Sequence, residues 1–220
     1  MPLILILAEC GVELIPKQIR NHPSVKKNLT NKLYASQLLD NSLHHSAMKQ
    51  LKNFEKRGRP DIVHLCLLNA LGSPLNKGGH LKLYMHTNKG KIFHYNSNIR
   101  IAKNYNRFKG LMANLLIDGE IKDFITQFKG SIRELIATFK NPEIFLFSHK
   151  GNLKKTYNEL FFKDMSKNIV AIIGGFQKGT FSKNILGLSQ KLTSISKEHL
   201  EAWIVTAKVI NYYEILHEII

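Results

Sequence analysis

The chain opens with an uninterrupted run of apolar residues that ends at a charged one. Residues 3–8 read LILILA, and Glu9 follows them. A short, continuous apolar run rich in isoleucine is typical of a strand that is buried on both faces. The same pattern recurs at 144–147 (IFLF) and at 169–173 (IVAII). The sequence therefore predicts three buried strands, of which the last two are of the parallel type.

Apolar residues at helical spacing lie between and after these strands. They predict helices over about residues 36–51, 60–72, 108–116 and 132–139, and a last helix from about residue 198. Pro60 and Asp61 suit a first helical turn, because proline lacks only an N–H that has no partner there and an acid favours the positive helix end. Helices interleaved with buried strands predict an α/β fold. With no linker or repeat in the chain, we expect one domain over residues 1–220.

A β-hairpin is predicted between the second and third of these helices. Residues 80–87 and 91–95 favour strands, and Asn88-Lys89-Gly90 between them is a turn signal. We expect a third short strand at 99–101. Residues 80–101 would thus form a small β-hairpin and strand extension of the domain.

The charge balance narrows the choice of partner. Thirty-two Lys and Arg against 16 Asp and Glu give a formal net charge of +16, with a sequence pI near 9.8. Such an excess is typical of proteins that bind a polyanion. The apolar run at 2–8 is far shorter than the roughly 20 residues that span a bilayer, so we expect no membrane span. No basic segment precedes this run, so a secretory signal is not expected either.

Cysteine and histidine patterns favour neither a disulfide framework nor a metal site. Cys10 and Cys66 lie in unrelated apolar contexts, which suits an intracellular protein. The adjacent histidines at 44–45 have no ligand partner at metal-site spacing, and the chain contains no HExxH or CxxC motif. We therefore expect no metal. His64 and His86 are expected to be packed, hydrogen-bonded histidines rather than catalytic groups.

Two loops that follow predicted strands are candidates for ligand binding. The first, 172–179 (IIGGFQKG), places glycines directly after a buried strand, where backbone can approach a ligand closely. It lacks the GxGxxG spacing of a dinucleotide site, and a tight turn is the alternative. The second, 192–200, leads into the last helix. Ser196 is the expected N-cap of that helix, with Glu198 in its first turn, so capping is a sufficient explanation of this segment.

Cations and aromatic residues gather between positions 59 and 109. Arg59 precedes a predicted helix, and Arg100, Lys103 and Arg107 follow the predicted hairpin, interleaved with aromatic residues. Arginine binds phosphate through two parallel hydrogen bonds and aromatic rings stack on unpaired bases, so this mixture favours RNA. A solvated basic face is the alternative. Asp61 is either a general base or orienting carboxylate, or a first-turn helix acid paired with Arg59.

Several short segments, in this order along the chain, resemble a known family. They are Leu38-Leu39-Asp40 with Ser42-Leu43-His44-His45 and Ala47-Met48, Arg59-Pro60-Asp61-Ile62-Val63-His64, Leu67-Leu68, Ser73-Pro74-Leu75-Asn76, His86-Thr87, Arg100-Ile101, Arg107-Phe108 with Gly110-Leu111-Met112, Lys140-Asn141-Pro142, Gly174-Gly175-Phe176 with Gly179, and Ser194-Ile195-Ser196. From about residue 38 onward the chain resembles the small-subunit ribosomal RNA pseudouridine N1-methyltransferase family. That family belongs to the SPOUT superfamily of knotted methyltransferases and acts in ribosome biogenesis. The RPDIVH and SPLN segments carry most of the specificity.

The resemblance implies a fold and a cofactor. The fold would be a SPOUT-type α/β fold, a parallel sheet flanked by helices, with a deep trefoil knot in the C-terminal part, about residues 140–220. S-adenosyl-L-methionine would bind in the knotted part. The positions that match the family's cofactor loops are Gly174, Gly179, Ile195, Ser196, Lys197, Glu198, His199 and Leu200. A third loop, after the strand at 144–147, is expected to contribute near Ser148.

The resemblance also implies RNA contacts and catalytic residues. The RNA contacts match Arg59, Arg100, Lys103 and Arg107, and lysine stands at 103 where the family usually has arginine. Arg59 and Asp61 match the RPD motif and would act on the target base. The expected activity is methylation of nitrogen 1 of a pseudouridine in small-subunit (16S/18S-type) ribosomal RNA.

Partners, location and alternatives follow from the same resemblance. We expect a homodimer, with ribosomal proteins of the assembling small subunit as further partners, in the cytoplasm or, in a eukaryote, the nucleolus. One alternative function is that of a non-catalytic RNA-binding assembly factor with the same fold. Another is that of a SPOUT methyltransferase that acts on another RNA, such as transfer RNA.

Overall fold

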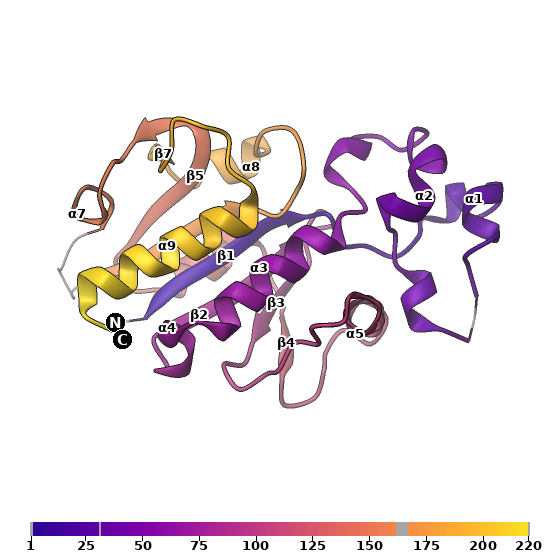
Figure 1. The fold of residues 1–220 in the computed structure, drawn as a ribbon, viewed down its shortest axis with the longest axis horizontal. Helices are drawn as coiled ribbons and strands as arrows, with labels where there is room; N and C mark the ends of the chain where they lie inside the picture. The colour runs from indigo at the N-terminus through magenta and orange to yellow at the C-terminus, as the bar shows by residue number, and fades with distance from the viewer. Residues whose placement is uncertain (1, 31, 162–166, 220) are drawn as a thin grey trace.

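One β-sheet forms the centre of the molecule (Figure 1). A computed structural model describes residues 2–30, 32–161 and 167–219. In these ranges seven strands form the sheet, in the order β4-β3-β2-β1-β6-β5-β7. Strands β2, β1, β6, β5 and β7 run parallel, and β3 and β4 add antiparallel at one edge. Their bounds are β1 Leu3–Cys10, β2 Leu81–Thr87, β3 Ile92–Tyr95, β4 Ile125–Phe128, β5 Pro142–Leu153, β6 Asn168–Gly174 and β7 Leu192–Ser194.

The central strand β1 explains the apolar run that opens the sequence. All eight of its residues are buried. Its odd-numbered leucines belong to the hydrophobic cluster on one face of the sheet, and its even-numbered isoleucines belong to the cluster on the other face. Successive side chains of a strand point to opposite faces, so a strand covered on both sides needs apolar residues throughout. The predicted strands at 144–147 and 169–173 lie in β5 and β6 and are parallel, as expected.

Helices cover both faces of the sheet and give a mixed α/β fold. The helices α3, α5 and α9 pack on the face occupied by the leucines, and α6 and α8 pack on the other. Figure 1 shows α3 and α9 side by side across the sheet. The α-helices are α1 Pro23–Lys26, α2 Asn41–Met48, α3 Pro60–Gly72, α4 Pro74–Lys77, α5 Tyr105–Asp118, α6 Ile132–Ala137, α7 Tyr157–Leu160, α8 Lys183–Leu186 and α9 Ala202–His217, and the 3-10 helices are η1 Lys17–Ile19, η2 Tyr34–Gln37 and η3 Phe54–Lys56.

The predicted helix over 36–51 is wrong at its start. A 3-10 helix, η2, ends at Gln37, and α2 begins only at Asn41. Between them Asp40 is extended, and its carboxylate accepts a hydrogen bond from the Ser42 backbone N–H at 3.0 Å. A side chain that caps the helix in this way stops it from extending toward the N-terminus. Leu38 joins the main core, and the other buried apolar residues of this region form a separate small cluster with Ile15, Ile19 and Val25.

The predicted hairpin is present, but the third strand predicted at 99–101 is wrong. Strands β2 and β3 pair antiparallel, and β2 also pairs with β1, so the hairpin continues the main sheet. After β3 the chain turns, with the Asn98 N–H donating to the Asn96 side chain at 2.9 Å. Ile99 and Ile101 are buried as anchors in irregular chain. The strand that pairs with β3 is β4 instead.

Candidate functional site

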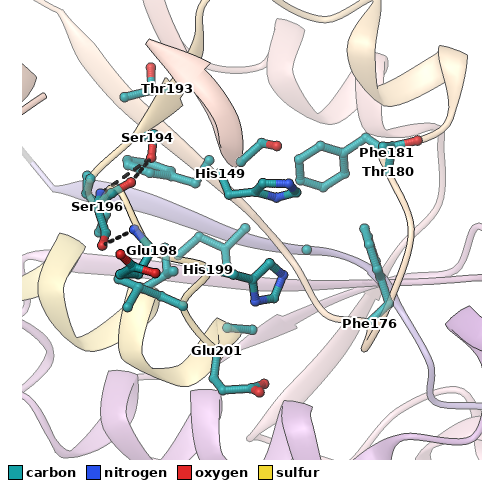
Figure 2. A pocket seen from close by; sticks show the side chains of 18 of the residues that line it. His149, Phe176, Thr180, Phe181, Thr193, Ser194, Ser196, Glu198, His199 and Glu201 are labelled. Atoms are coloured by element: carbon teal, nitrogen blue, oxygen red, sulfur yellow. Dashed lines mark hydrogen bonds between the residues drawn. The ribbon is translucent and has the colours of Figure 1, made fainter. Parts of the chain in front are cut away.

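A pocket lies at the carboxyl ends of β6 and β7, beside the middle of β5 (Figure 2). The loops that follow β6 and β7, residues 147–149 of β5 and the first turn of α9 line it, and the space including its open mouth is about 770 Å³. Parallel α/β sheets bind ligands at this edge, because the loops that leave neighbouring strand ends diverge there and leave a crevice.

The wall formed by β5 depends on a bulge. The strand pairs with Thr193 of β7 both before and after residues 148–151, which leave the ladder. Gly151 permits this close approach, since a Cβ atom there would lie 2.4 Å from the Thr193 nitrogen. The bulge brings Ser148 and His149 to the pocket.

The glycine loop after β6 is held against the end of β1. The Gly175 N–H donates to the Ala8 carbonyl at 2.8 Å, and the Gly175 carbonyl accepts from the Gly11 N–H at 3.1 Å. A Cβ atom on Gly175 would lie 2.4 Å from the Cys10 sulfur, so only glycine fits. Gly179 has φ of +108°, which again favours glycine. The loop is therefore a specific structure whose inner side lines the pocket.

The second loop, before α9, is ordered by its serine hydroxyls. Ser194 Oγ donates to the Ser196 carbonyl at 2.7 Å, and Ser196 Oγ accepts from the Glu198 N–H at 3.0 Å (Figure 2). The prediction that Ser196 is the N-cap of the last helix is wrong, because α9 begins at Ala202 with Glu201 as its N-cap. The serine hydroxyl forms a turn inside the loop instead.

The lining of the pocket is typical of a small-molecule site, with an apolar surface and a few polar groups. The apolar and aromatic side chains are Phe147, Ile173, Phe176, Phe181, Ile195, Leu200 and Val205. Polar groups come from Ser148, Ser194, Ser196, Glu198 and Glu201. Figure 2 shows His149 and His199 near each other at the pocket, with ring centroids 5.2 Å apart and the rings tilted by 58°. Such a surface suits a planar base held between apolar side chains and a polar chain held at its edge.

Most of the residues that the sequence predicted for cofactor binding lie at this pocket. Lys197 is exposed and is not part of the wall. Those that line it are Ser148, Gly174, Gly179, Ile195, Ser196, Glu198, His199 and Leu200.

Two residues that the sequence prediction missed hold the glycine loop from outside. Glu9 accepts hydrogen bonds from Lys56 Nζ at 2.8 Å and from the Ser182 N–H at 3.1 Å. Lys56 Nζ also donates to the Thr180 carbonyl and lies 4.4 Å from the centroid of the Phe176 ring. Burial raises the pKa of Glu9, but the bonds from Lys56 and Ser182 outweigh it, so the pKa lies below its ordinary value. The signal in the sequence was a carboxylate directly after the apolar run 3–8, at a position that the structure places inside β1.

Arg59 and Asp61 form an ion pair at the start of α3. Arg59 Nε lies 2.8 Å from one Asp61 oxygen, and Nη2 lies 2.6 Å from the other. The hydrogen bond to Asp61 raises the pKa of Arg59, and the charges of Asp61 and Glu201 raise it further, against the effect of burial. Neither Arg59 nor Asp61 lines the pocket, but Glu201, whose charge acts on Arg59, does. The Asp61 side chain is 39% exposed, so a ligand can reach it.

The other predicted RNA contacts lie in solvent beyond the same end of α3. Arg100 and Lys103 are exposed on the segment before α5, and Arg107 is exposed on its first turn. His64 Nε2 donates to the Ala102 carbonyl at 2.7 Å and so ties this segment to α3. His64 is thus a packed, hydrogen-bonded histidine, as the sequence predicted.

Neither a metal site nor a membrane span is found in the described ranges. No group of three or more His, Cys, Asp or Glu there could hold a metal ion. No helix in those ranges is long and apolar enough to cross a membrane.

Fold and pocket together define an α/β protein with a small-molecule site at the carboxyl edge of a mostly parallel sheet. The model of the EMG1/NEP1 methyltransferase family matches residues 5–214. The chain therefore belongs to this family.

Named relatives match over nearly the whole chain. "Ribosomal RNA small subunit methyltransferase Nep1" of Staphylothermus marinus is 42% identical, with 100% of this chain and 98% of that protein covered. The protein of the same name from Thermococcus kodakarensis is 36% identical, with 96% of each chain covered. The crystal structure of Archaeoglobus fulgidus Nep1 bound to S-adenosylhomocysteine superposes with a TM-score of 0.85 at 34% identity, and covers 99% of this chain and 100% of that one.

Proposed function

We propose that this protein transfers a methyl group from S-adenosyl-L-methionine to nitrogen 1 of a pseudouridine in small-subunit ribosomal RNA. The observation that carries the proposal is the pocket at the ends of β6 and β7, beside the bulge of β5, in a chain of the EMG1/NEP1 methyltransferase family. Relatives are named small-subunit rRNA methyltransferases. The solved relative binds S-adenosylhomocysteine, which is what the cofactor becomes after it has given up its methyl group.

The pocket residues fit this cofactor. The Phe176 ring and the aliphatic Leu200 side chain offer apolar contacts for an adenine, and the 174–179 loop, which lines the same pocket, offers backbone groups for its edge. Ser148 and the 195–200 loop offer polar groups for the ribose and the amino-acid part. When bound there, the cofactor supplies an electrophilic methyl group on a positively charged sulfonium. The sulfonium leaves as a neutral thioether, so the transfer needs no metal.

Arg59 and Asp61 supply the chemistry at the target base. Pseudouridine carries a free N1–H because its ribose is attached through carbon. Both oxygens of Asp61 accept from Arg59, but a carboxylate has about four acceptor positions, so it can also accept or orient this N1–H. Asp61 would take up the N1 proton, the nitrogen would gain the methyl group, and the sulfonium would be left as a neutral thioether. Arg59 holds the carboxylate in place and can bind a neighbouring phosphate.

The target nucleotide has to leave its stack to reach Asp61. The exposed Arg100, Lys103 and Arg107 can bind the flanking phosphates. Lysine at 103 keeps the charge of the family's arginine but not its two parallel hydrogen bonds.

The proposal includes a homodimer. Leu65 of α3 and Ile204 of α9 are 39% and 40% exposed on neighbouring helices, which supports an apolar contact between two copies. Sedimentation as a monomer at micromolar concentration would contradict this part. The deep trefoil knot of the C-terminal part and the contacts with ribosomal proteins remain predictions.

Methyl transfer to one RNA hairpin, made with uridine or with pseudouridine at the target, tests the activity. We expect transfer only to pseudouridine, and equal rates on both would refute the specificity. Asp61→Asn should lower the rate by about 10²–10⁴-fold with cofactor affinity unchanged. The matched control is Asp118→Asn, which changes an exposed acid at the end of α5. Calorimetry that detects no S-adenosyl-L-methionine binding would favour the non-catalytic assembly factor.

A further inference from the structure

A second cavity, which we call the hairpin cleft, lies beside the glycine loop. It is lined by the end of the β2–β3 hairpin (86–90), the segment 52–57, and the starts of α6 and α8 (131–133 and 182–185), with Glu9 at its base. Its space, open solvent included, is about 1570 Å³. It shares no lining residue with the cofactor pocket and contains none of the RNA contacts predicted above.

The hairpin cleft is strongly cationic. Glu9 is its one lining carboxylate, and it is already bonded to Lys56 and Ser182. Glu13 lies behind the wall, paired with Arg57 at 2.6 Å. The cationic side chains come from three walls and are Lys52, Lys56, Arg57, Lys89 and Arg133. Even with both carboxylates counted, positive charge is left in excess, and a cleft lined by one sign of charge attracts ions of the other.

Three of these cations are available to a ligand. Lys52 is exposed, and the Lys89 side chain is 62% exposed with its Nζ 3.9 Å from the nearest Glu13 oxygen. The exposed Arg133 makes one long hydrogen bond, at 3.4 Å to the Gly187 carbonyl. These side chains can turn to an anion without breaking a buried ion pair.

His86 adds an uncharged donor to the same wall. Its Nδ1 accepts from the Glu9 N–H at 3.2 Å. A neutral ring that accepts at Nδ1 carries its proton at Nε2. Burial lowers the pKa of His86, and the charge of Glu9 offsets this only in part. The ring therefore stays neutral at pH 7 and offers an N–H rather than a charge.

The cleft is connected with the predicted catalytic end of α3. The Arg59 N–H donates to the Gly11 carbonyl at 3.0 Å, and the Asn88 N–H donates to the carbonyl of the adjacent Cys10 at 3.0 Å. Lys56 and Arg59 are three residues apart, which is at most about 11 Å of extended chain. A few nucleotides of one strand can reach both places.

We propose that the hairpin cleft binds backbone phosphates of the substrate RNA beyond the target nucleotide. This inference rests on the proposed action on RNA. The cations are spread over three walls of a cleft much larger than one inorganic phosphate, which fits successive phosphates of a strand better than a small anion. Lys56 lies between this cleft and the cofactor loop, so RNA bound here also contacts the residue that holds the loop.

The test compares two triple variants with the same change of charge. The cleft variant is Lys52→Gln/Lys89→Gln/Arg133→Gln. The control is Lys77→Gln/Lys122→Gln/Lys140→Gln, which changes exposed lysines near the amino ends of β2, β4 and β5. The affinity for the target hairpin, extended by single strands on both sides, is measured over a range of salt concentrations.

We expect the cleft variant to bind this RNA about ten-fold more weakly. The slope of log K against log salt should become shallower by about 2, at roughly 0.7 for each lost phosphate contact with a single strand. Cofactor affinity should stay at the wild-type value, because none of the three residues contacts the glycine loop. The control should match the wild type in all three measurements.

A second RNA series locates the effect. The 5′ and 3′ extensions are removed one at a time. Removal of one of them, the one that reaches the cleft, should abolish the difference in affinity between the cleft variant and the wild type. Equal behaviour of both triple variants on the extended RNA would overturn the proposal and leave methylation untouched. Phosphate-only binding, detected as displacement by inorganic phosphate without any dependence on RNA length, would also overturn it. A wild type that binds RNA but does not methylate it would refute the proposed function and not the cleft.

Discussion

Lys56→Met tests whether the residues outside the pocket hold the cofactor loop. Methionine keeps an apolar stem and removes the Nζ that bonds Glu9 and Thr180 and lies over the Phe176 ring. Glu9 keeps its bond to the Ser182 N–H and remains buried at 8% exposure. The substitution therefore removes the charged contact between the two segments with little change in packing.

The expected magnitude follows from how far the pair is buried. The Lys56 and Glu9 side chains are 22% and 11% exposed. Exposed pairs contribute about 0–1 kcal/mol, and removal of one partner of a fully buried pair costs about 3–5 kcal/mol, so we expect about 2 kcal/mol here. If this energy holds the loop in its binding conformation, cofactor affinity falls about 30-fold.

Titration calorimetry with S-adenosyl-L-methionine measures the effect, and steady-state kinetics shows where it acts. Because Lys56 contacts the loop and not the reacting groups, KM for the cofactor should rise while kcat changes little. Lys52→Met, in the same segment but exposed, is the control and should bind the cofactor normally. Lys56→Arg should restore most of the affinity. A folded Lys56→Met protein whose cofactor affinity lies within two-fold of the wild type would refute the reasoning.

Two further predictions concern stability. Gly151→Ala should lower the free energy of unfolding by about 3 kcal/mol in chemical denaturation, because the new Cβ would lie 2.4 Å from a backbone nitrogen of β7. The control, Gly72→Ala, has no atom within 4 Å of the new Cβ and should cost almost nothing. Similar losses in both variants would contradict this account of the bulge. Burial raises the pKa of Asp40, but hydrogen bonds, including that from Lys109 at 3.0 Å, hold it below the ordinary value of 3.8. The stabilisation by ionised Asp40 is present above about pH 4 and is lost as pH falls through the folded-state pKa. Asp40→Asn should therefore lower the free energy of unfolding by about 3 kcal/mol at pH 7 and by progressively less below about pH 4. A loss that does not depend on pH would refute this.

The pattern of apolar, proline and glycine residues was enough to predict the interior strands, one helix and the loops at the strand ends. The three apolar runs became interior strands, since a strand covered on both faces has no room for polar residues. The helix over 60–72 was predicted with its observed bounds, because Pro60 suits its first turn and the apolar spacing runs to its end. The glycine loop after β6 and the loop after β7 were placed correctly next to strand ends.

The same reasoning failed in two places for different reasons. Asp40 stops α2 through a local cap on Ser42, which the apolar spacing of 36–51 did not reveal. That β4 rather than 99–101 pairs with β3 depends on residues about 30 positions apart. The residues at 99–101 look like a strand because they are anchored in the core, and burial alone does not require strand pairing.

The sequence by itself determined the fold class, the basic character and the loops from which a ligand site is built, because apolar periodicity, charge and glycine position are local properties. Only the tertiary structure decided that Glu9 and Lys56, 47 positions apart, together hold the cofactor loop. It also placed a bulge of β5 at the pocket and brought cations from three separate segments into one cleft. Ion pairs and clefts depend on how the elements pack in space, and the spacing of residues along the chain does not show which distant residues come into contact.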